Sequence, residues 1–207
     1  MLVKTFGSAL YGIHAITITV EVCIDTGINF FMVGLPDNAV KESHQRIDSA
    51  LRNIGFKIPG KKITINMAPA DIRKEGSSYD LTLAVGILAA DNIVKKDKLE
   101  SFMIMGELSL DGSLQPIKGA LPIAIEAHRK GFKGILLPKQ NAMEAAIVTK
   151  LEVYGVEHIR EVIGFLNDEI KLDRLVINIK ELFGSQQEDC EFDFADVKGQ
   201  NNITLFI

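Results

Sequence analysis

One stretch, residues 61–89, constrains the fold more than any other part of the chain. It begins with alternating β-branched and polar residues from Ile63 to Met67, which predict a half-buried strand. Pro69 ends that strand because proline has no N–H to donate. A polar loop follows at 71–77, and Ser78–Asp80 open an apolar helix. Its predicted buried face consists of Leu81, Ala84, Val85 and Leu88. Backbone N–H groups at such a loop can bind an anion, an oxyanion or a partner's carboxylate, or the loop can serve only to cap the helix.

Strand and helix patterns alternate along the rest of the chain. Residues 2–34 have the pattern of β structure, with a strand at 16–22, a turn at 25–27 and a return strand at 28–33, which predicts a hairpin or meander. A helix is predicted from Asp37 or Asn38 to Gly55. Further on we predict strands at 102–110, 113–117, 135–137 and 151–154 and helices at 120–130, 141–148 and 159–166. This alternation predicts a layered α/β fold with mixed strand directions.

Composition narrows the class of protein. The 207 residues are 47% hydrophobic and 24% charged, which is typical of a globular chain. No apolar run approaches the roughly 20 residues of a membrane span, and the first residues lack signal-peptide features, so we expect a cytoplasmic protein without a membrane partner. The net charge of −4 argues against nucleic-acid binding by the whole surface but leaves a local basic patch open.

Metal and nucleotide sites find no support in the sequence. The four histidines (14, 44, 128 and 158) and the two cysteines (23 and 190) have no metal-binding spacing, so we expect no metal. Neither a G-x-x-x-x-G-K-[ST] nor a G-x-G-x-x-G pattern occurs, so we expect no nucleotide cofactor in this chain.

Nucleophilic catalysis is the sharpest hypothesis from the residues themselves. Ser77 and Ser78 lie at a glycine-containing strand-to-helix loop. A serine there can act as a nucleophile if a base lies within hydrogen-bond distance. Lys118 and Lys74 are the nearest candidate bases, and His128 is a remote one. A lysine base has to be buried to lose its proton near neutral pH. Lys118 lies in a turn and Lys74 among charges, so we expect neither to be desolvated, and a helix cap is the simpler role for Ser78.

Three blocks of sequence together resemble a known family. The first is Val33–Asp37 with Val40–Ser43 and Arg46, and the second is Ile63–Asp71 with Lys74–Gly76 and Tyr79–Leu81. The third is Gly106–Leu108 with Leu110, Gly112, Leu114 and Pro116–Gly119. All three are similar to the N-terminal domain of the YifB/ComM family of magnesium-chelatase-like AAA+ ATPases.

The resemblance implies a domain organisation. Residues 1–170 would form a Lon-protease-like domain, a ribosomal-protein-like two-layer α/β fold with a mixed sheet and flanking helices. Residues 171–192 would be an acidic linker, and residues 193–207 the truncated start of an AAA+ ATPase module. ATP and Mg²⁺ would bind in that module, not here. The parent protein would form a hexameric ring, with this domain contacting its own AAA+ module and neighbouring subunits, and the family is associated with DNA processing in natural transformation.

Comparison with Lon proteases bears on the serine hypothesis. The resemblance aligns Ser78 with the Lon nucleophile, but it aligns Leu121 with the Lon lysine, and leucine cannot deprotonate a serine. The implied role is therefore a non-catalytic substrate-engagement or assembly domain. The alternative is a Ser-Lys peptidase that uses Ser78 and Lys118.

Most of the candidate binding residues lie in the loop before the helix that begins at Ser78–Asp80. They are Arg73, Lys74, Glu75, Gly76, Ser78, Tyr79 and Asp80, with Glu107 on a nearby strand. Tyr79 and Asp80 could instead only cap the helix and fill the edge of the core. A third hypothesis is DNA binding through Lys61, Lys62, Arg73 and Lys74.

Overall fold

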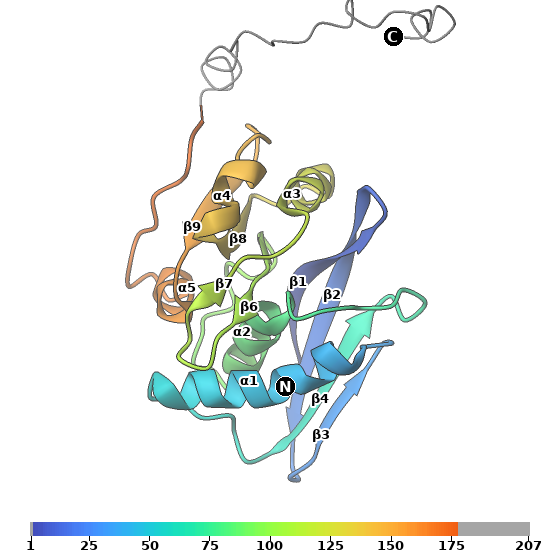
Figure 1. Ribbon diagram of the computed structural model, residues 1–207. Coiled ribbons are helices and arrows are strands. Elements are labelled where there is room, and N and C mark those ends of the chain that lie inside the picture. The colour runs from blue at the N-terminus through green and yellow to red at the C-terminus, as the bar shows by residue number, and fades with distance from the viewer. Residues whose placement is uncertain (1, 178–207) are drawn as a thin grey trace, which may run out of the picture. The chain divides into compact units, whose positions relative to one another are not determined.

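A computed structural model describes residues 2–177 (Figure 1). The strands are β1 (Leu2–Tyr11), β2 (His14–Asp25), β3 (Phe30–Val33), β4 (Lys62–Ala68), β5 (Phe102–Ile104), β6 (Glu107–Leu108), β7 (Leu114–Gln115), β8 (Gly134–Pro138) and β9 (Glu152–Val156). The helices are α1 (Asn38–Asn53), α2 (Asp80–Ala90), α3 (Ala120–Arg129), α4 (Lys139–Ala145) and α5 (Ile159–Leu166). The predicted AAA+ start at 193–207 and most of the predicted linker lie outside the described residues.

Seven strands form one mixed sheet in the order β3-β4-β2-β1-β5-β8-β9. A long antiparallel hairpin, β1 and β2, occupies its centre and turns at Gly12-Ile13. β4 extends the antiparallel half, and β5, β8 and β9 add in parallel on the other side. This confirms the predicted layered α/β fold with mixed strand directions and flanking helices.

The predicted hairpin between residues 16–22 and 28–33 is wrong. β3 pairs in parallel with β4, which lies between β3 and β2 in the sheet. The turn at 25–27 does exist, but the chain leaves the sheet there and returns one strand further out. Strand order depends on contacts between distant segments, which a local turn pattern does not encode.

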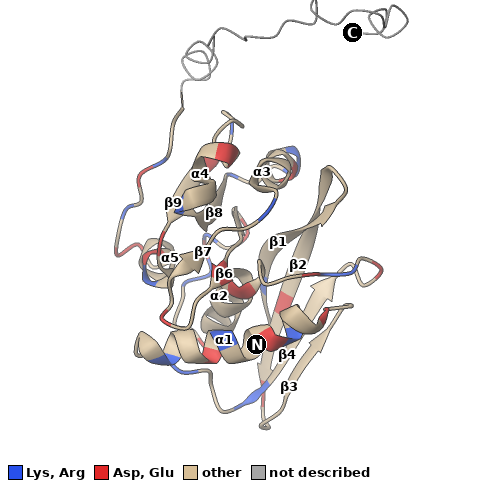
Figure 2. Cartoon of the chain, in the orientation of Figure 1, with Lys and Arg blue, Asp and Glu red and all other residues tan. Residues whose placement is uncertain are grey.

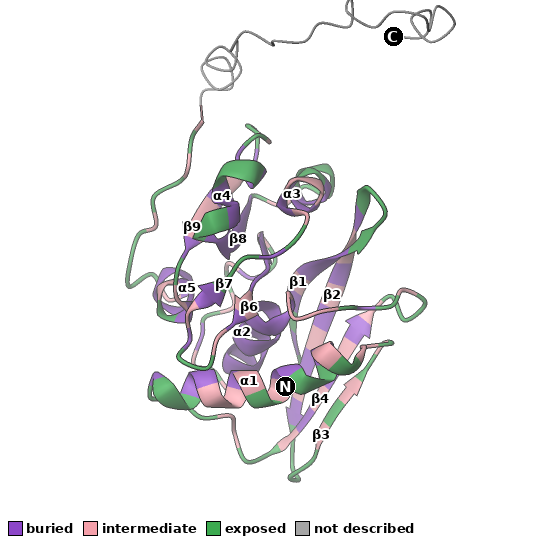
Figure 3. Ribbon diagram, viewed as in Figure 1, coloured by how far each residue is buried: buried purple, intermediate pink, exposed green. Residues whose placement is uncertain are grey.

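Helices α1 and α2 cover one face of the antiparallel half, and the core lies beneath them. Alternate residues of β2 and β4, such as Val20 and Ile65, are fully buried against this layer. The expectation of one apolar face on α2 is wrong, because all of its residues are buried (Figure 3). A helix that is apolar on every side is typical of a core position, and α2 lies against β1, β2 and α1.

The predicted long strand at 102–110 is interrupted. β5 ends at Ile104, and β6 begins at Glu107 and pairs with β7 instead of the main sheet. At the break, the Gly106 N–H donates to the Ser78 carbonyl, and the Leu81 N–H donates to the Gly106 carbonyl. The chain leaves the sheet here to hold the start of α2. The break between the two predicted strands, at Asp111-Gly112, is confirmed as part of the turn that joins β6 to β7.

The first residues after the predicted domain limit at 170 contact the domain. Leu172 packs against the core, and the Leu175 N–H donates to the Val153 carbonyl at 2.9 Å. Among residues 2–177, no helix combines the length and the apolar character that a bilayer span requires. In the same range no group of three or more His, Cys, Asp or Glu side chains could hold a metal ion.

Candidate functional site

A cavity of about 860 Å³ lies between the end of β1 and the loop that precedes α2. One wall is the segment Ser8–Gly12, and the opposite wall is formed by 71–73 and 75–79. Met105, Glu107, Ile123 and the turn at 116–118 complete the lining. Six of the predicted site residues line this cavity: Arg73, Glu75, Gly76, Ser78, Tyr79 and Glu107. Lys74 and Asp80 do not belong to the lining.

Asp37 ties the loop to the start of α1. One carboxylate oxygen accepts the Val40 N–H at 2.8 Å, which makes Asp37 the N-cap that the sequence predicts as one of two choices. The other oxygen accepts the Gly76 N–H at 3.1 Å. In the backbone, the Asp37 N–H donates to the Lys74 carbonyl and the Lys74 N–H donates to the Leu35 carbonyl. Two of the three sequence blocks thus meet in one short stretch of paired backbone.

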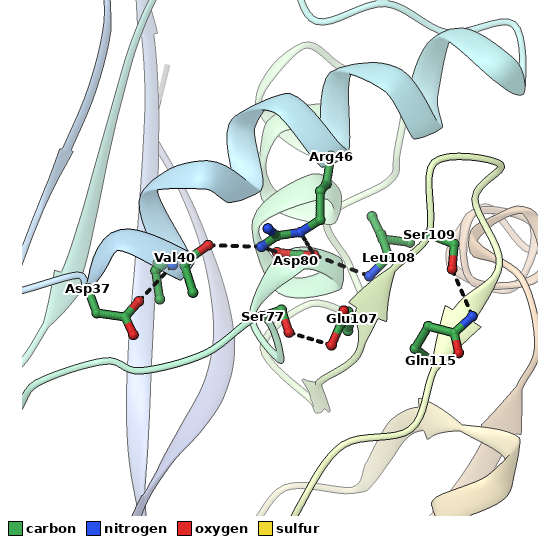
Figure 4. Close-up of polar contacts among 10 residues, drawn as sticks. Asp37, Val40, Arg46, Ser77, Asp80, Glu107, Leu108, Ser109 and Gln115 are labelled. Carbon is green, nitrogen blue, oxygen red and sulfur yellow. Dashed lines mark hydrogen bonds and ion pairs between the residues drawn. The ribbon is translucent and has the colours of Figure 1, made fainter.

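An ion pair lies behind the loop, between α1 and the first turn of α2 (Figure 4). The Arg46 guanidinium donates to both Asp80 carboxylate oxygens, at 2.7 and 2.9 Å. A third donor, the Leu108 N–H, reaches Asp80 at 3.3 Å. Asp80 is fully buried, whereas the Arg46 side chain is 22% exposed. The pair joins residues from all three blocks and fixes the orientation of the helix whose start borders the cavity.

Burial and hydrogen bonding shift the pKa of Asp80 in opposite directions. Burial raises the pKa of the Asp80 carboxyl, and the Arg46 guanidinium and the Leu108 N–H work against that rise. The same contact raises the pKa of Arg46, so its charged form is favoured further. Of the predicted alternative for Asp80, the helix cap is wrong, because its carboxylate bonds to Arg46 and to the Leu108 N–H and no side chain caps the start of α2, whereas its burial in the core is confirmed.

Ser77 and Ser78 occupy different environments on the cavity wall. The Ser77 hydroxyl donates to a carboxylate oxygen of Glu107 (Figure 4), which orients that acid along the wall. Ser78 is half-buried, and its carbonyl accepts the Gly106 N–H at 2.8 Å. Tyr79, beside it, is almost completely buried, and this burial raises the pKa of its phenol, as do the nearby carboxylates of Asp37 and Glu75.

The cavity lining contains no buried lysine that could act as a base for Ser78 among the described residues. Among the described residues, Lys118 is the single lysine on the cavity lining, and it is exposed. Leu121, at the position that the Lon comparison assigns to the lysine, lies in the first turn of α3 and is not part of the lining. A lysine base has to be buried, and Lys118 is not.

The expectation that Lys74 is not desolvated is wrong. Its side chain is fully buried, and its ammonium donates to the Pro69 carbonyl. Burial lowers the pKa of Lys74, and the carboxylate of Asp71 only partly opposes this. The backbone pairing with Leu35 pulls the residue inward, which the charged neighbours in sequence did not indicate. Since Lys74 is not on the cavity lining, its burial does not supply Ser78 with a base.

Replacing Lys74 by methionine should abolish one component of the pH dependence of folding. Since the folded pKa lies below the ordinary 10.5, the unfolded chain binds more protons in the interval between the two values. Wild-type stability should therefore rise with pH through that interval, by at most about 1.4 kcal/mol per pH unit. Urea unfolding between pH 7 and 10.5 measures this slope. Lys118→Met, which removes the same charge from an exposed position, should keep the slope, and a slope retained in Lys74→Met would contradict the assignment.

The predicted basic patch is not assembled as expected. Lys74 is buried, Lys61 lies 3.4 Å from Asp91, and the Arg73 guanidinium pairs with Glu75 at 3.1 Å. The Lys62 ammonium lies 5.7 Å from the centre of the Phe31 ring. Figure 2 likewise shows positive and negative residues interspersed along the described elements, as on α1. DNA binding through these four residues as one surface is excluded by the burial of Lys74.

Sequence reasoning missed two parts of this site. Arg46 was named only in the first block of the family resemblance and given no role in the site, but it lies one position before buried Ile47 and three after buried Ser43, so the period of α1 did carry a signal. The wall formed by Ser8–Gly12 carried none, because it reaches the loop only through the pairing of β1 in the sheet.

The fold and the site define a Lon-like α/β domain in which the loop before a buried helix borders a cavity. The chain belongs to the family described as subunit ChlI of Mg-chelatase, which matches residues 20–141. Residues from all three blocks that form the loop and its supports lie within this matched range.

Individual relatives agree with this assignment. The chain is 38% identical over 198 residues to competence protein ComM of Haemophilus influenzae, covering 95% of this chain and 39% of that protein. It is 42% identical over 208 residues to the protein YifB of Salmonella typhimurium, covering 95% of this chain and 41% of YifB. Lon protease 2 of Bacillus subtilis is 30% identical over 138 residues, 67% of this chain and 23% of the protease. The chain thus spans about two fifths of the length of the ComM and YifB proteins.

Proposed function

We propose that this chain is a non-catalytic domain of a magnesium-chelatase-like AAA+ protein, where it engages a substrate or a neighbouring subunit. The cavity between β1 and the 71–79 loop is its binding site. In this role Arg73, Glu75, Ser78 and Glu107 contact the bound molecule, while Arg46 and Asp80 hold the loop in position.

The observation that carries this proposal is the combination of a serine-bearing cavity with an exposed lysine. Ser78 and Lys118 both line the cavity, but Lys118 remains in contact with solvent. Lysine acts as a general base where burial removes it from solvent, and Lys118 lacks that burial. The cavity is of a size typical of binding sites, roughly 300–1,000 Å³.

The complete protein is part of the same proposal. ATP and Mg²⁺ would bind in an AAA+ module outside this chain, and a hexameric ring would convert ATP hydrolysis into remodelling of its substrate. One relative is named a competence protein, which is in keeping with DNA as that substrate. A cytoplasmic location belongs to the same proposal. This domain would then contact its own AAA+ module, adjacent subunits or the material being remodelled.

The alternative is a Ser-Lys peptidase, which is favoured by the presence of Ser78 and Lys118 on one lining. A fluorophosphonate probe distinguishes the two, because it reacts with serines whose hydroxyl is activated by a base. We expect no labelling of the wild-type chain beyond that of Ser78→Ala, measured by intact mass. Ser77→Ala is the matched control, since Ser77 lies next to Ser78 but bonds to Glu107. Labelling that is lost in Ser78→Ala and retained in Ser77→Ala would overturn the non-catalytic role.

A further inference from the structure

Where β1 lines the cavity, its edge opposite β2 is not paired with another strand of the described sheet. Tyr11 and His14 close the two-residue turn of the β1–β2 hairpin, so the peptide groups of Tyr11 and Ala9 point toward β2. Those of Leu10 and Ser8 therefore point away from β2. Within residues 2–177, the neighbouring strand β5 pairs with β1 at a single position, Phe6 opposite Met103, and then diverges.

Contacts along this edge agree with that alternation. The Ser8 N–H donates to the Met105 sulfur at 3.2 Å, which lies on the side away from β2. A thioether sulfur is a weak acceptor, so this amide has only a poor partner. Beyond it, Leu10 lines the cavity, and the alternation directs its peptide group away from β2. The edge thus presents backbone donors and acceptors in the order that an added strand requires.

Side chains around the edge suit an extended chain. Leu10 is 43% exposed and Tyr11 is 74% exposed, so an apolar rim flanks the open backbone. On the opposite wall the loop residues Gly76 and Ser77 offer little bulk. An extended segment could therefore lie between the two walls with its backbone against β1 and alternate side chains directed to either side.

The charges of the cavity do not suit a polyanion. Three acidic side chains line it, Asp71, Glu75 and Glu107, against the two cations Arg73 and Lys118. Arg73 is in addition paired with Glu75 at 3.1 Å. A nucleic-acid backbone needs an excess of positive charge along its path. A polypeptide backbone is uncharged and needs only hydrogen-bond partners.

We propose that the cavity binds an extended polypeptide segment, which adds as a strand to the open edge of β1 at Ser8–Leu10. The inference rests on the proposed binding function and names its ligand class. Backbone hydrogen bonds would supply the affinity, so the site would accept many sequences. Pockets beside Leu10 and Glu107 would impose only mild preferences on alternate side chains.

Hydrogen–deuterium exchange of the 207-residue chain with reduced, carboxymethylated α-lactalbumin, an unfolded probe protein, tests the proposal. The expected result is slower exchange at 8–12 and 71–79. Leu10→Pro removes the edge N–H and should weaken binding at least tenfold, measured by fluorescence anisotropy. Leu10→Ala is the matched control: it removes the apolar side chain, keeps the N–H and should weaken binding less than threefold.

Other outcomes overturn the proposal. Protection confined to another strand, no binding, or equal effects of Leu10→Pro and Leu10→Ala would each exclude strand addition at β1. Protection of 8–12 by a single-stranded oligonucleotide in place of the polypeptide would assign the cavity to nucleic acid. If Leu10→Pro does not fold, the wild-type exchange pattern and Leu10→Ala still decide the question. Cleavage of the probe that requires Ser78 would overturn the non-catalytic function and leave strand addition standing, so the two failures are distinct.

Discussion

Replacing Arg46 by alanine is expected to lower the free energy of unfolding by about 3–5 kcal/mol, because it leaves the fully buried Asp80 carboxylate without its charge partner. The donor that remains among residues 2–177, the Leu108 N–H at 3.3 Å, cannot compensate for two guanidinium hydrogen bonds. The stability of Arg46→Lys should lie between those of wild type and Arg46→Ala, since an ammonium keeps the charge but cannot form the bidentate contact. Urea unfolding followed by circular dichroism measures all three.

The pH dependence of Arg46→Ala identifies the cause of its instability. Burial raises the pKa of Asp80, and removing Arg46 removes the main opposing contact, so the pKa should rise further. An acid with a raised folded pKa binds more protons in the folded state. Its contribution to stability is therefore present below the unfolded value of about 4 and is lost as the pH rises through the folded pKa. The deficit of Arg46→Ala relative to wild type should shrink as the pH is lowered.

A double-mutant cycle provides the control. Asp80→Asn should be milder than Arg46→Ala, because the partly exposed Arg46 can contact water once its partner is neutral. The double variant Arg46→Ala/Asp80→Asn should be more stable than Arg46→Ala alone, since it no longer buries an unpaired charge. If the two single effects simply add, the buried charge is not the source of the loss.

Replacing Gly34 by alanine is expected to destabilise the chain by about 3–5 kcal/mol, as the sum of backbone strain and a steric clash. Gly34 has a φ of +99°, and a Cβ atom there would lie 2.2 Å from the Met67 carbonyl oxygen. The close approach places residues 34–37 beside the end of β4, where they pair with Lys74. The loop that borders the cavity should therefore loosen together with the fold.

Gly55→Ala separates the two contributions. Gly55 has a similar φ of +90°, but nothing lies within 4 Å of its added Cβ. Gly55→Ala should therefore lower the free energy of unfolding only by the strain of a left-handed backbone, roughly 1–2 kcal/mol. Urea unfolding of both variants gives the two losses in the free energy of unfolding. The difference between them measures the clash with Met67. Equal losses at the two positions would contradict a close approach at Gly34.

Elements with a strong local pattern were predicted correctly. α1 has its N-cap at Asp37 and ends within two residues of the predicted Gly55, and α5 has the predicted bounds. β4 alternates buried and half-buried residues as its sequence alternates. Where only contacts between strands decide the pairing, as for β3, the prediction failed.

The candidate site was predicted in part. Most of the loop that lines the cavity was identified from its serines, glycine and charges, and Glu107 from its place in the third block. Lys74 was misjudged because its charged neighbours in sequence point to solvent while its side chain is buried under the Pro69 carbonyl. The role of Arg46 was not predicted, because its partner Asp80 lies 34 residues further along the chain.

The sequence by itself determined where most strands and helices lie, the loop between β4 and α2, and the family of the chain. These depend on hydrogen bonds and side-chain periods that operate over a few residues. The tertiary structure alone decided that β4 lies between β2 and β3, that Lys74 and Asp80 are buried, and that the end of β1 and Ser78 line one cavity. Burial and strand neighbours depend on which distant segments meet, and that follows from packing the whole core at once.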